Sequence, residues 1–327
     1  MRNALRALAA GGSPGGAPAA GKLPGVVLRV AITALLLWLA FRHANWSMIQ
    51  AGLVRMRGGW FAAAVALLGL QLAVAAQRWR WIMAGCGLAL PAASALRYVF
   101  IGQFFSQTLP ATIGADGARI WYLGRTSGNW KSAAYSVVID RSIGGLALGI
   151  LVVAILPGAF SRIHDPAGQM SLLVVGGACL AAFASVIAIG VFPFWDRWPA
   201  TRHARVITSI SWKLFRNPPS VLRIGVSSLA IHLLSVLSVW CIAAALTVPL
   251  GAMDAVFLVP PVMLITMVPI SVAGWGVRES AMVAALSYAG VGSSQGLLIS
   301  ILFGLGSFLL GLAGGAVWIA GLRNERD

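Results

Sequence analysis

The sequence has little charge, and negative charge is the scarcest. Only 10% of its 327 residues are charged, and 8 Asp and Glu face 24 Lys and Arg, which gives a formal net charge of +16. An ordinary soluble domain carries roughly a quarter charged residues, whereas 59% of this chain is hydrophobic and its mean hydropathy is +0.87. This composition excludes a soluble globular protein. It indicates one polytopic membrane domain, divided by the ~20 apolar residues that a bilayer crossing requires.

Cysteine is also scarce. Cys86, Cys179 and Cys241 lie in apolar stretches without paired spacing, so the sequence predicts neither a disulfide framework nor a zinc site. No Ser-His-Asp order, metal-spaced cluster, phosphate loop or paired-carboxylate motif stands out, and His232, alone in an apolar run, is expected to be a core histidine. We therefore expect no metal, no cofactor and no enzyme activity.

Six apolar runs are long enough to span a bilayer. They cover residues 24–41, 60–77, 132–157, 169–193, 223–247 and 294–320. Two further stretches, 92–109 and 253–269, each lead into a Pro- and Gly-rich segment and a short second arm, which is the pattern of a broken helix or re-entrant hairpin. The predicted fold is therefore an all-α polytopic membrane protein. A cleaved signal peptide is the alternative for 24–41, although no small-residue cleavage site follows this run.

The basic residues predict the orientation. They crowd one connection, at Arg197, Arg202, Arg205, Lys213, Arg216 and Arg223, which should therefore be cytoplasmic. Val206, Ile207, Ile210 and Leu214 recur opposite them at helical spacing, so a basic amphipathic helix is expected on the inner leaflet. Because the basic residues flank membrane segments, they do not predict nucleic-acid binding. Both termini are therefore expected to be cytoplasmic.

The expected domain organisation is a single transmembrane unit over residues 23–320. Residues 1–22 are rich in Gly, Ala and Pro and should form a disordered cytoplasmic tail, and residues 321–327 should form a second tail. Trp79 and Trp81, which alternate with arginines near the end of the second span, are expected to anchor at the headgroup level.

Two motifs suggest an internal repeat. Residues 110–119, Pro-Ala-Thr-Ile-Gly-Ala-Asp-Gly-Ala-Arg, align without gaps on residues 269–278, Pro-Ile-Ser-Val-Ala-Gly-Trp-Gly-Val-Arg. The same offset of 159 brings two spans of the first half near two spans of the second. Because three full crossings separate the hairpins, the sequence predicts an inverted repeat, about 24–157 and 169–320, the symmetry that secondary transporters use around a midplane site. The alternative is generic loop chemistry in a Gly-rich membrane protein.

Charged residues within the membrane regions are the main functional candidates. At bilayer depth such a residue costs about 2.5–3.5 kcal/mol on insertion scales, so it usually faces a polar cavity or pairs with another charge. Asp140 and Arg141 are neighbours in a span and point about 100° apart, so they cannot simply pair with each other. The alternative reading is that arginines and carboxylates merely neutralise one another inside the bundle.

The second arm of each hairpin could bind an anion. Helix N-termini present unpaired N–H groups, glycines let a phosphate approach the backbone, and an arginine adds a planar fork of donors. The acidic residues could orient the arginines, bind a cationic part of a headgroup or carry a coupling proton. The candidate substrate-binding residues are Arg119, Arg278, Asp116, Glu279, Asp140, Arg141, Gly114, Gly117, Gly274, Gly276, Thr112 and Ser271.

These motifs resemble the signatures of the lysylphosphatidylglycerol synthase transmembrane-region family. The first comprises Arg97-Tyr98, Gly102, Phe105, Leu109-Pro110, Gly114-Ala115-Asp116-Gly117-Ala118-Arg119, Asp140-Arg141 and Gly144. The second is Pro269-Ile270-Ser271-Val272-Ala273-Gly274-Trp275-Gly276-Val277-Arg278-Glu279, and a weaker element is Arg78-Trp79-Arg80-Trp81. The resemblance covers roughly residues 24–320. It implies a flippase-like domain, as in the N-terminal half of the bacterial multiple peptide resistance factors, which move aminoacylated phosphatidylglycerol between leaflets.

The chain departs from this family pattern in two ways. Ala115 stands where the family usually has Gly, and Asp140 where Glu is common. No aminoacyl-transferase domain follows the membrane domain in this sequence, so synthesis of an aminoacyl lipid is not expected. The leading hypothesis is a flippase for an anionic or phosphate-bearing lipid. The alternatives are a membrane enzyme acting on lipid or polyprenyl phosphates, and a non-transporting partner of a lipid synthase. The expected protein partners are a lipid synthase and a second copy of the chain, which would form a homo-oligomer.

Overall fold

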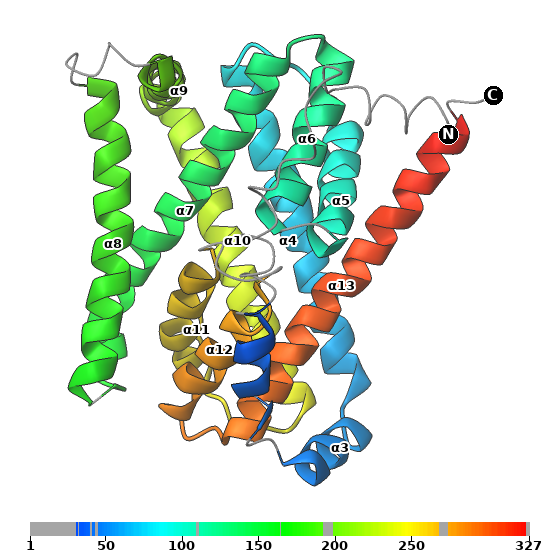
Figure 1. Ribbon diagram of the computed structural model, residues 1–327, viewed down its shortest axis with the longest axis vertical. Helices are drawn as coiled ribbons and strands as arrows, with labels where there is room; N and C mark the ends of the chain where they lie inside the picture. Colours follow the sequence, from blue (N-terminus) through cyan, green and yellow to red (C-terminus); the bar gives the residue numbers. More distant parts are fainter. Residues whose placement is uncertain are drawn as a thin grey trace.

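The computed structural model of the protein is helical, and the residues that it describes contain no strand (Figure 1). These residues are 31, 33–39, 41–42, 45–108, 111–163, 165–191, 199–267 and 274–324. The helices are α3 (Trp46–Val54), α4 (Gly58–Gly85), α5 (Ala92–Thr108), α6 (Ala111–Ser127), α7 (Trp130–Phe160), α8 (Pro166–Val191), α9 (Pro199–Phe215), α10 (Pro218–Ala245), α11 (Ala252–Thr266), α12 (Val277–Ser287) and α13 (Ser293–Asn324). The prediction of an all-α polytopic membrane protein is confirmed.

Four helices in the described part of the chain are long and apolar enough to cross a membrane, and they match four of the predicted spans. They are Gly58–Gly85, Trp130–Phe160, Pro218–Ala245 and Ser293–Gly321. Helix α8, with 26 residues, exceeds the ~20 that a crossing needs and corresponds to the predicted span 169–193. The predicted span 24–41 is helical at residues 31, 33–39 and 41, and its other residues lie outside the described ones.

Helices α4 and α13 extend beyond the spans predicted from the sequence. Helix α4 does not end at residue 77 but continues to Gly85, because residues 78–84 contain neither proline nor glycine to interrupt it. Helix α13 runs to Asn324, so part of the predicted tail 321–327 is helical. The predicted tail 1–22 lies outside the described residues.

Each predicted hairpin is a pair of short helices that pack against each other, α5 with α6 and α11 with α12. Their lengths of 17, 17, 15 and 11 residues are below that of a full crossing. In Figure 1, α5 and α6 occupy the upper half of the bundle and α11 and α12 the lower half, so the two pairs come from opposite ends. The connecting residues 109–110 and 268–273 lie outside the described part of the chain.

Small residues bring each hairpin against a long helix from the other half of the sequence. Helix α13 crosses α5 so closely that a Cβ on Gly314 would overlap the carbonyl oxygen of Phe100. On the other side of the bundle, a Cβ on Gly158 of α7 would overlap the ring of Phe257 in α11. Glycine permits such backbone approach in membrane bundles. The central contact, between α4 and α10, also joins the two halves.

Helix α9 confirms the predicted amphipathic helix in the basic connection. It is seen end on at the top of Figure 1, so it lies across the long axis of the bundle. Ile207, Ile210 and Leu214 belong to one apolar cluster with Ile82 near the end of α4. The C-terminal end of α13 lies at the same end of the molecule.

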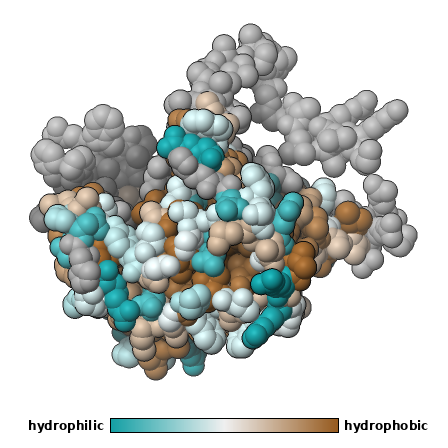
Figure 2. Space-filling view, turned by 90° about the horizontal axis from the view of Figure 1, so that it is seen from below, coloured by the Kyte–Doolittle hydropathy of each residue, from teal (hydrophilic) through white to brown (hydrophobic). Residues whose placement is uncertain are grey.

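The opposite end of the bundle is closed by polar contacts between the α7–α8 turn and the second hairpin. Arg162 forms an ion pair with Asp254, which lies in the first turn of α11. Asp165 accepts hydrogen bonds from the backbone N–H of Gly168 and from the hydroxyl of Tyr288, and these hold the pKa of its carboxyl below the ordinary 3.8. Figure 2, which views this end, shows hydrophilic and apolar residues intermixed.

Cysteine labelling tests this arrangement of ends. Ser47 of α3 and Ser209 of α9 are exposed and lie at opposite ends of the bundle, so an impermeant maleimide should label Ser47→Cys and Ser209→Cys from opposite sides of the membrane. Burial raises the pKa of the Cys86 thiol from 9.0 to about 11, which lowers its thiolate fraction about a hundredfold near neutral pH. Cys86 should therefore contribute little background. Labelling of both sites from one side would contradict the fold.

Candidate functional site

The upper half of the bundle contains a buried arginine next to the tryptophan that the sequence analysis placed at the headgroup level. Arg78 of α4 is 6% exposed, and the adjacent Trp79 is completely buried. The predicted role of Trp79 as a headgroup anchor is therefore wrong. Because α4 continues beyond both residues to Gly85, they face neighbouring helices. The indole N–H of Trp79 donates to the hydroxyl of Ser136 on α7 at 3.2 Å.

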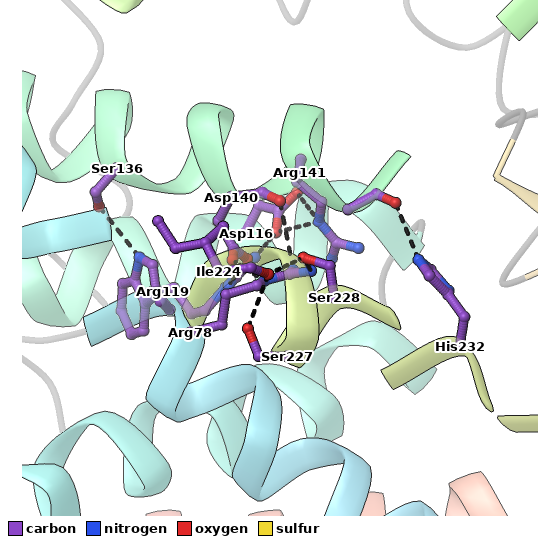
Figure 3. Close-up of polar contacts among 12 residues, drawn as sticks. Arg78, Asp116, Arg119, Ser136, Asp140, Arg141, Ile224, Ser227, Ser228 and His232 are labelled. Carbon is purple, nitrogen blue, oxygen red and sulfur yellow. Dashed lines mark hydrogen bonds and ion pairs between the residues drawn. The ribbon is translucent and has the colours of Figure 1, made fainter. Parts of the chain in front are cut away.

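Asp140 of α7 bridges two arginines from two other helices (Figure 3). Arg78 donates through Nε to Oδ1 of Asp140 at 2.9 Å, and Arg119 of α6 donates through Nη1 to Oδ2 at 3.0 Å. All three side chains are less than a tenth exposed. Both carboxylate oxygens are therefore engaged, and α4, α6 and α7 are joined at one buried point.

Asp116 extends this arrangement towards the surface. Arg119 donates through Nη2 to Asp116 at 2.6 Å, and the Nε of Arg141 lies 2.9 Å from each oxygen of the same carboxylate. The side chain of Arg141 is 46% exposed. Since Asp140 pairs with Arg119 and Arg141 with Asp116, the prediction that the neighbours Asp140 and Arg141 do not pair with each other is confirmed.

The result is an unbroken line of five alternating charges, which we call the ion chain: Arg78, Asp140, Arg119, Asp116 and Arg141. Three guanidinium groups and two ionised carboxylates leave one net positive charge. Within the described residues, Arg141 is hydrogen-bonded only through Nε, so its two terminal amino groups face outward without a partner. The exposed end of the ion chain is therefore suited to binding an anion.

Neighbouring groups hold the buried end of the ion chain. Arg78 donates to the hydroxyl of Ser228 on α10 at 3.1 Å, and its guanidinium lies against Gly144 of α7. The carbonyl of Gly144 is in turn 3.0 Å from Nε2 of His232, which supports the expectation of a satisfied core histidine. The guanidinium of Arg119 stacks over Trp79 at 5.2 Å.

The second hairpin contains a separate, self-neutralising cluster. Arg278 donates to Oε1 of Glu279 at 2.6 Å, and Ser300 of α13 donates to the same oxygen at 3.2 Å. The other oxygen of Glu279 accepts the backbone N–H of Gly276 at 2.6 Å, which forms a capping box at the start of α12. Glu279 is completely buried. Here the carboxylate orients the arginine and occupies the helix N-terminus.

The two clusters share a construction. Each has an arginine over an aromatic face, Arg119 over Trp79 and Arg278 over Trp275 at 4.8 Å. Each also places a guanidinium against a glycine of a long helix. Gly144 of α7 receives Arg78, and Gly304 of α13 receives Arg278; these glycines are 160 positions apart.

The predicted glycines do not all lie at helix starts. Gly276, with φ of 84°, is the N-cap of α12, and Gly274 has φ of 78° just before it. Gly114 is in the first turn of α6, but Gly117 is inside that helix, so its proposed place at the start of the second arm was wrong. Thr112 is in α6, and Ser271 lies outside the described residues.

Sequence reasoning identified four members of the ion chain and missed Arg78 and Ser228. The signal for Arg78 was the uninterrupted helical sequence beyond residue 77, which places an arginine inside a span. Among the described residues, no three His, Cys, Asp or Glu side chains could together hold a metal ion.

A comparison with known protein families gave a match over most of the chain. The family described as Lysylphosphatidylglycerol synthase TM region matches residues 26–315, so the chain belongs to this family. A search of curated proteins found no match.

Removing the shared carboxylate tests the ion chain. Asp140→Asn leaves two buried guanidinium groups without their common counter-charge, so the free energy of unfolding should fall by about 3–5 kcal/mol. Unfolding of the purified protein in micelles measures this. The matched control is Arg162→Gln, which breaks a half-exposed pair and should cost about 0–1 kcal/mol. Equal losses in the two variants would contradict the central role of Asp140.

Adding a methyl group at Gly304 tests the close contact between this glycine and the guanidinium of Arg278, which we call the arginine seat. In an open helical position, Gly→Ala stabilises by about 0.5–1 kcal/mol. At Gly304 the new Cβ would overlap the guanidinium of Arg278, which Glu279 holds in place, so Gly304→Ala should destabilise by about 1–3 kcal/mol. Gly225→Ala in α10, where the Cβ meets no atom, is the control and should not destabilise. Thermal unfolding in micelles distinguishes the two; a stabilised Gly304→Ala would refute the seat.

Proposed function

We propose that this member of the lysylphosphatidylglycerol synthase transmembrane-region family is a lipid flippase and not an enzyme. It moves a lipid with an anionic, phosphate-bearing headgroup, aminoacylated or not, between the leaflets of the bacterial inner membrane. The C-terminus is cytoplasmic in this proposal, because the basic helix α9 and the end of α13 share one end of the bundle and basic connections favour the cytoplasm. The even number of predicted spans then puts the N-terminus on the same side. A lipid synthase and a second copy of the chain are candidate partners.

The ion chain is the observation that carries this proposal. It crosses from a buried position at Arg78 to a half-exposed position at Arg141 and holds one more arginine than carboxylate. The excess positive charge has its free donors at the half-exposed Arg141, where a lipid phosphate would compensate it. Because guanidinium binds phosphate and carboxylate through the same fork of donors, a phosphate can replace a carboxylate at one arginine after another without leaving a donor unpaired.

Asp116 is the group that such an exchange would displace first. Its side chain is 20% exposed, against 5% for Asp140, so it can reach water when a phosphate takes its place at Arg141. Asp140 would remain and keep Arg78 and Arg119 in position. In this scheme Asp116 gates access to Arg119, and Asp140 is the fixed counter-charge.

The arrangement of helices supports alternating access. A long helix, a hairpin and a second long helix follow one another in each half, as α4, α5–α6 and α7 and then as α10, α11–α12 and α13, with α8 and α9 between the two sets. The corresponding long helices and hairpins run in opposite directions in Figure 1. This is the relation expected for an inverted repeat, in which rocking of one half against the other exposes a site to each leaflet in turn. Glu279 and Arg278 would serve the second half as Asp116 and Arg119 serve the first.

Transport by purified protein tests the proposal. In proteoliposomes carrying phosphatidylglycerol with a fluorescent acyl chain, quenching of the outer leaflet should reveal protein-dependent flipping. Arg119→Gln should slow flipping by about tenfold or more, because a charge-assisted contact of about 1.5–3 kcal/mol is lost. Arg141→Gln should also slow it by a comparable factor.

The second variant separates function from folding. Arg141 is half exposed and, among the described residues, forms its hydrogen bonds and ion pair with Asp116 alone, so its loss should leave the free energy of unfolding within about 1 kcal/mol of the wild-type value. Arg216→Gln, an exposed arginine stacked on Trp212 at the end of α9, is the control and should flip lipid normally. If Arg119→Gln and Arg141→Gln both retain the wild-type rate, the ion chain does not carry the headgroup.

A further inference from the structure

The start of α5 and the end of α6 line a half-open cavity that is separate from the ion chain. We call these the open ends of the hairpin, because they lie opposite the connection between the two helices. The cavity has a volume of about 240 Å³, and it is lined by Arg97 and Tyr98 of α5 and by Tyr122, Arg125 and Thr126 of α6. The cavity is smaller than the roughly 300–1,000 Å³ pockets that enclose drug-sized ligands. It can hold a headgroup while acyl chains remain outside.

The floor of this cavity is rigid. The rings of Tyr98 and Tyr122 are stacked with centroids 5.1 Å apart. The hydroxyls of Tyr98 and Thr126 are hydrogen-bonded at 2.8 Å, and Thr126 also donates to the carbonyl of Tyr122 at 2.8 Å. These contacts join the first turns of α5 to the last turns of α6, so the lining does not depend on a ligand for its shape.

Two arginines flank the floor of the cavity. Within the described part of the chain, neither Arg97 nor Arg125 has an ion pair or hydrogen bond to a carboxylate. Arg97 lies against Gly321 of α13, where a side chain at that position would displace its guanidinium. Arg125 stacks on Trp121 at 5.3 Å. A planar guanidinium held by packing retains its donors for an anion.

The open ends of the second hairpin are different. There the first turn of α11 supplies an acid, Asp254, which is neutralised by Arg162 from the α7–α8 turn. Tyr288, just after α12, is likewise engaged by Asp165 of the same turn. The polar groups at the open ends of the second hairpin are therefore paired with other residues of the protein, whereas the first hairpin presents two arginines to a ligand.

The cavity and one member of the ion chain, Arg119, lie along the same helix, α6. On α6, Tyr122 lies three residues after Arg119 and Thr126 lies four residues after Tyr122, and these spacings place them on one face of the helix. The part of the cavity that α6 lines is thus about one to two helical turns from Arg119.

We propose that this cavity is a docking site for a phosphate-bearing anion, bound by Arg97 and Arg125 over the Tyr98–Tyr122 floor. The inference rests on the proposed function: the headgroup of the transported lipid docks here before it enters the ion chain. The same chemistry would accept the phosphate of a soluble molecule.

Binding to the purified full-length protein in micelles tests the site. The probe is dihexanoyl phosphatidylglycerol, measured by calorimetry, with dihexanoylglycerol as the probe without phosphate. The double variant Arg97→Gln/Arg125→Gln should weaken binding of the phosphate probe by about tenfold or more. Arg216→Gln is the matched control, because it is an arginine stacked on a tryptophan at the same end of the bundle; it should bind within about twofold of wild type.

The outcomes separate the sources of phosphate. Competition by millimolar inorganic phosphate would support a site that reads the phosphate alone. Binding of the lipid probe without such competition would support a site for a lipid headgroup. Unchanged binding of the probe in the double variant, or equal binding of dihexanoylglycerol by the wild type, would overturn the inference.

A second measurement distinguishes this inference from the proposed function. In the flipping experiment the double variant should raise the lipid concentration at half-maximal rate by about tenfold and leave the maximal rate unchanged. If the wild type binds the probe through these arginines and flips no lipid, the docking site stands and the flippase proposal fails. If the wild type flips lipid and the double variant matches it in both parameters, the docking site is refuted and the flippase proposal stands.

Discussion

The architecture of the upper half depends on one requirement: charges inside an apolar bundle must compensate one another. Asp140 meets it by receiving Arg78 on one oxygen and Arg119 on the other. An unpaired ion at this depth would cost several kcal/mol, and pairing recovers this only with good geometry. Three helices are therefore constrained to a single relative position, and the first hairpin is held by its arginine as well as by apolar packing.

Close packing and charge placement act together in this protein. The same helices that carry glycine at the hairpin crossings, α7 and α13, also carry the glycines that seat the guanidinium groups of Arg78 and Arg278. A missing side chain thus lets a helix approach in one place and makes room for a cation in another. The two hairpins differ in their balance: the first contains an excess of positive charge, and the second neutralises Arg278 with Glu279. This difference makes the first hairpin the better site for an anion.

Much of the fold and part of the site could be predicted from the sequence. Long apolar runs predicted the spans, and the cost of a charge at membrane depth singled out Asp140 and Arg141 in a span and Asp116 and Arg119 in the second arm of a hairpin. Arg78 was missed because a pair of arginines beside two tryptophans is equally typical of a membrane interface. Only the continuation of α4 to Gly85 distinguishes these cases.

The sequence by itself determined that this is a helical membrane protein with broken helices and a few expensive charges, because hydropathy and helix length are local properties of the chain. The partners of those charges were decided only by the tertiary structure. Asp140 and Arg141 are adjacent yet belong to different links of the ion chain, and Arg78 joins it across 62 positions. Such pairings arise from the angles and depths at which separate helices cross, and these depend on the packing of the whole bundle.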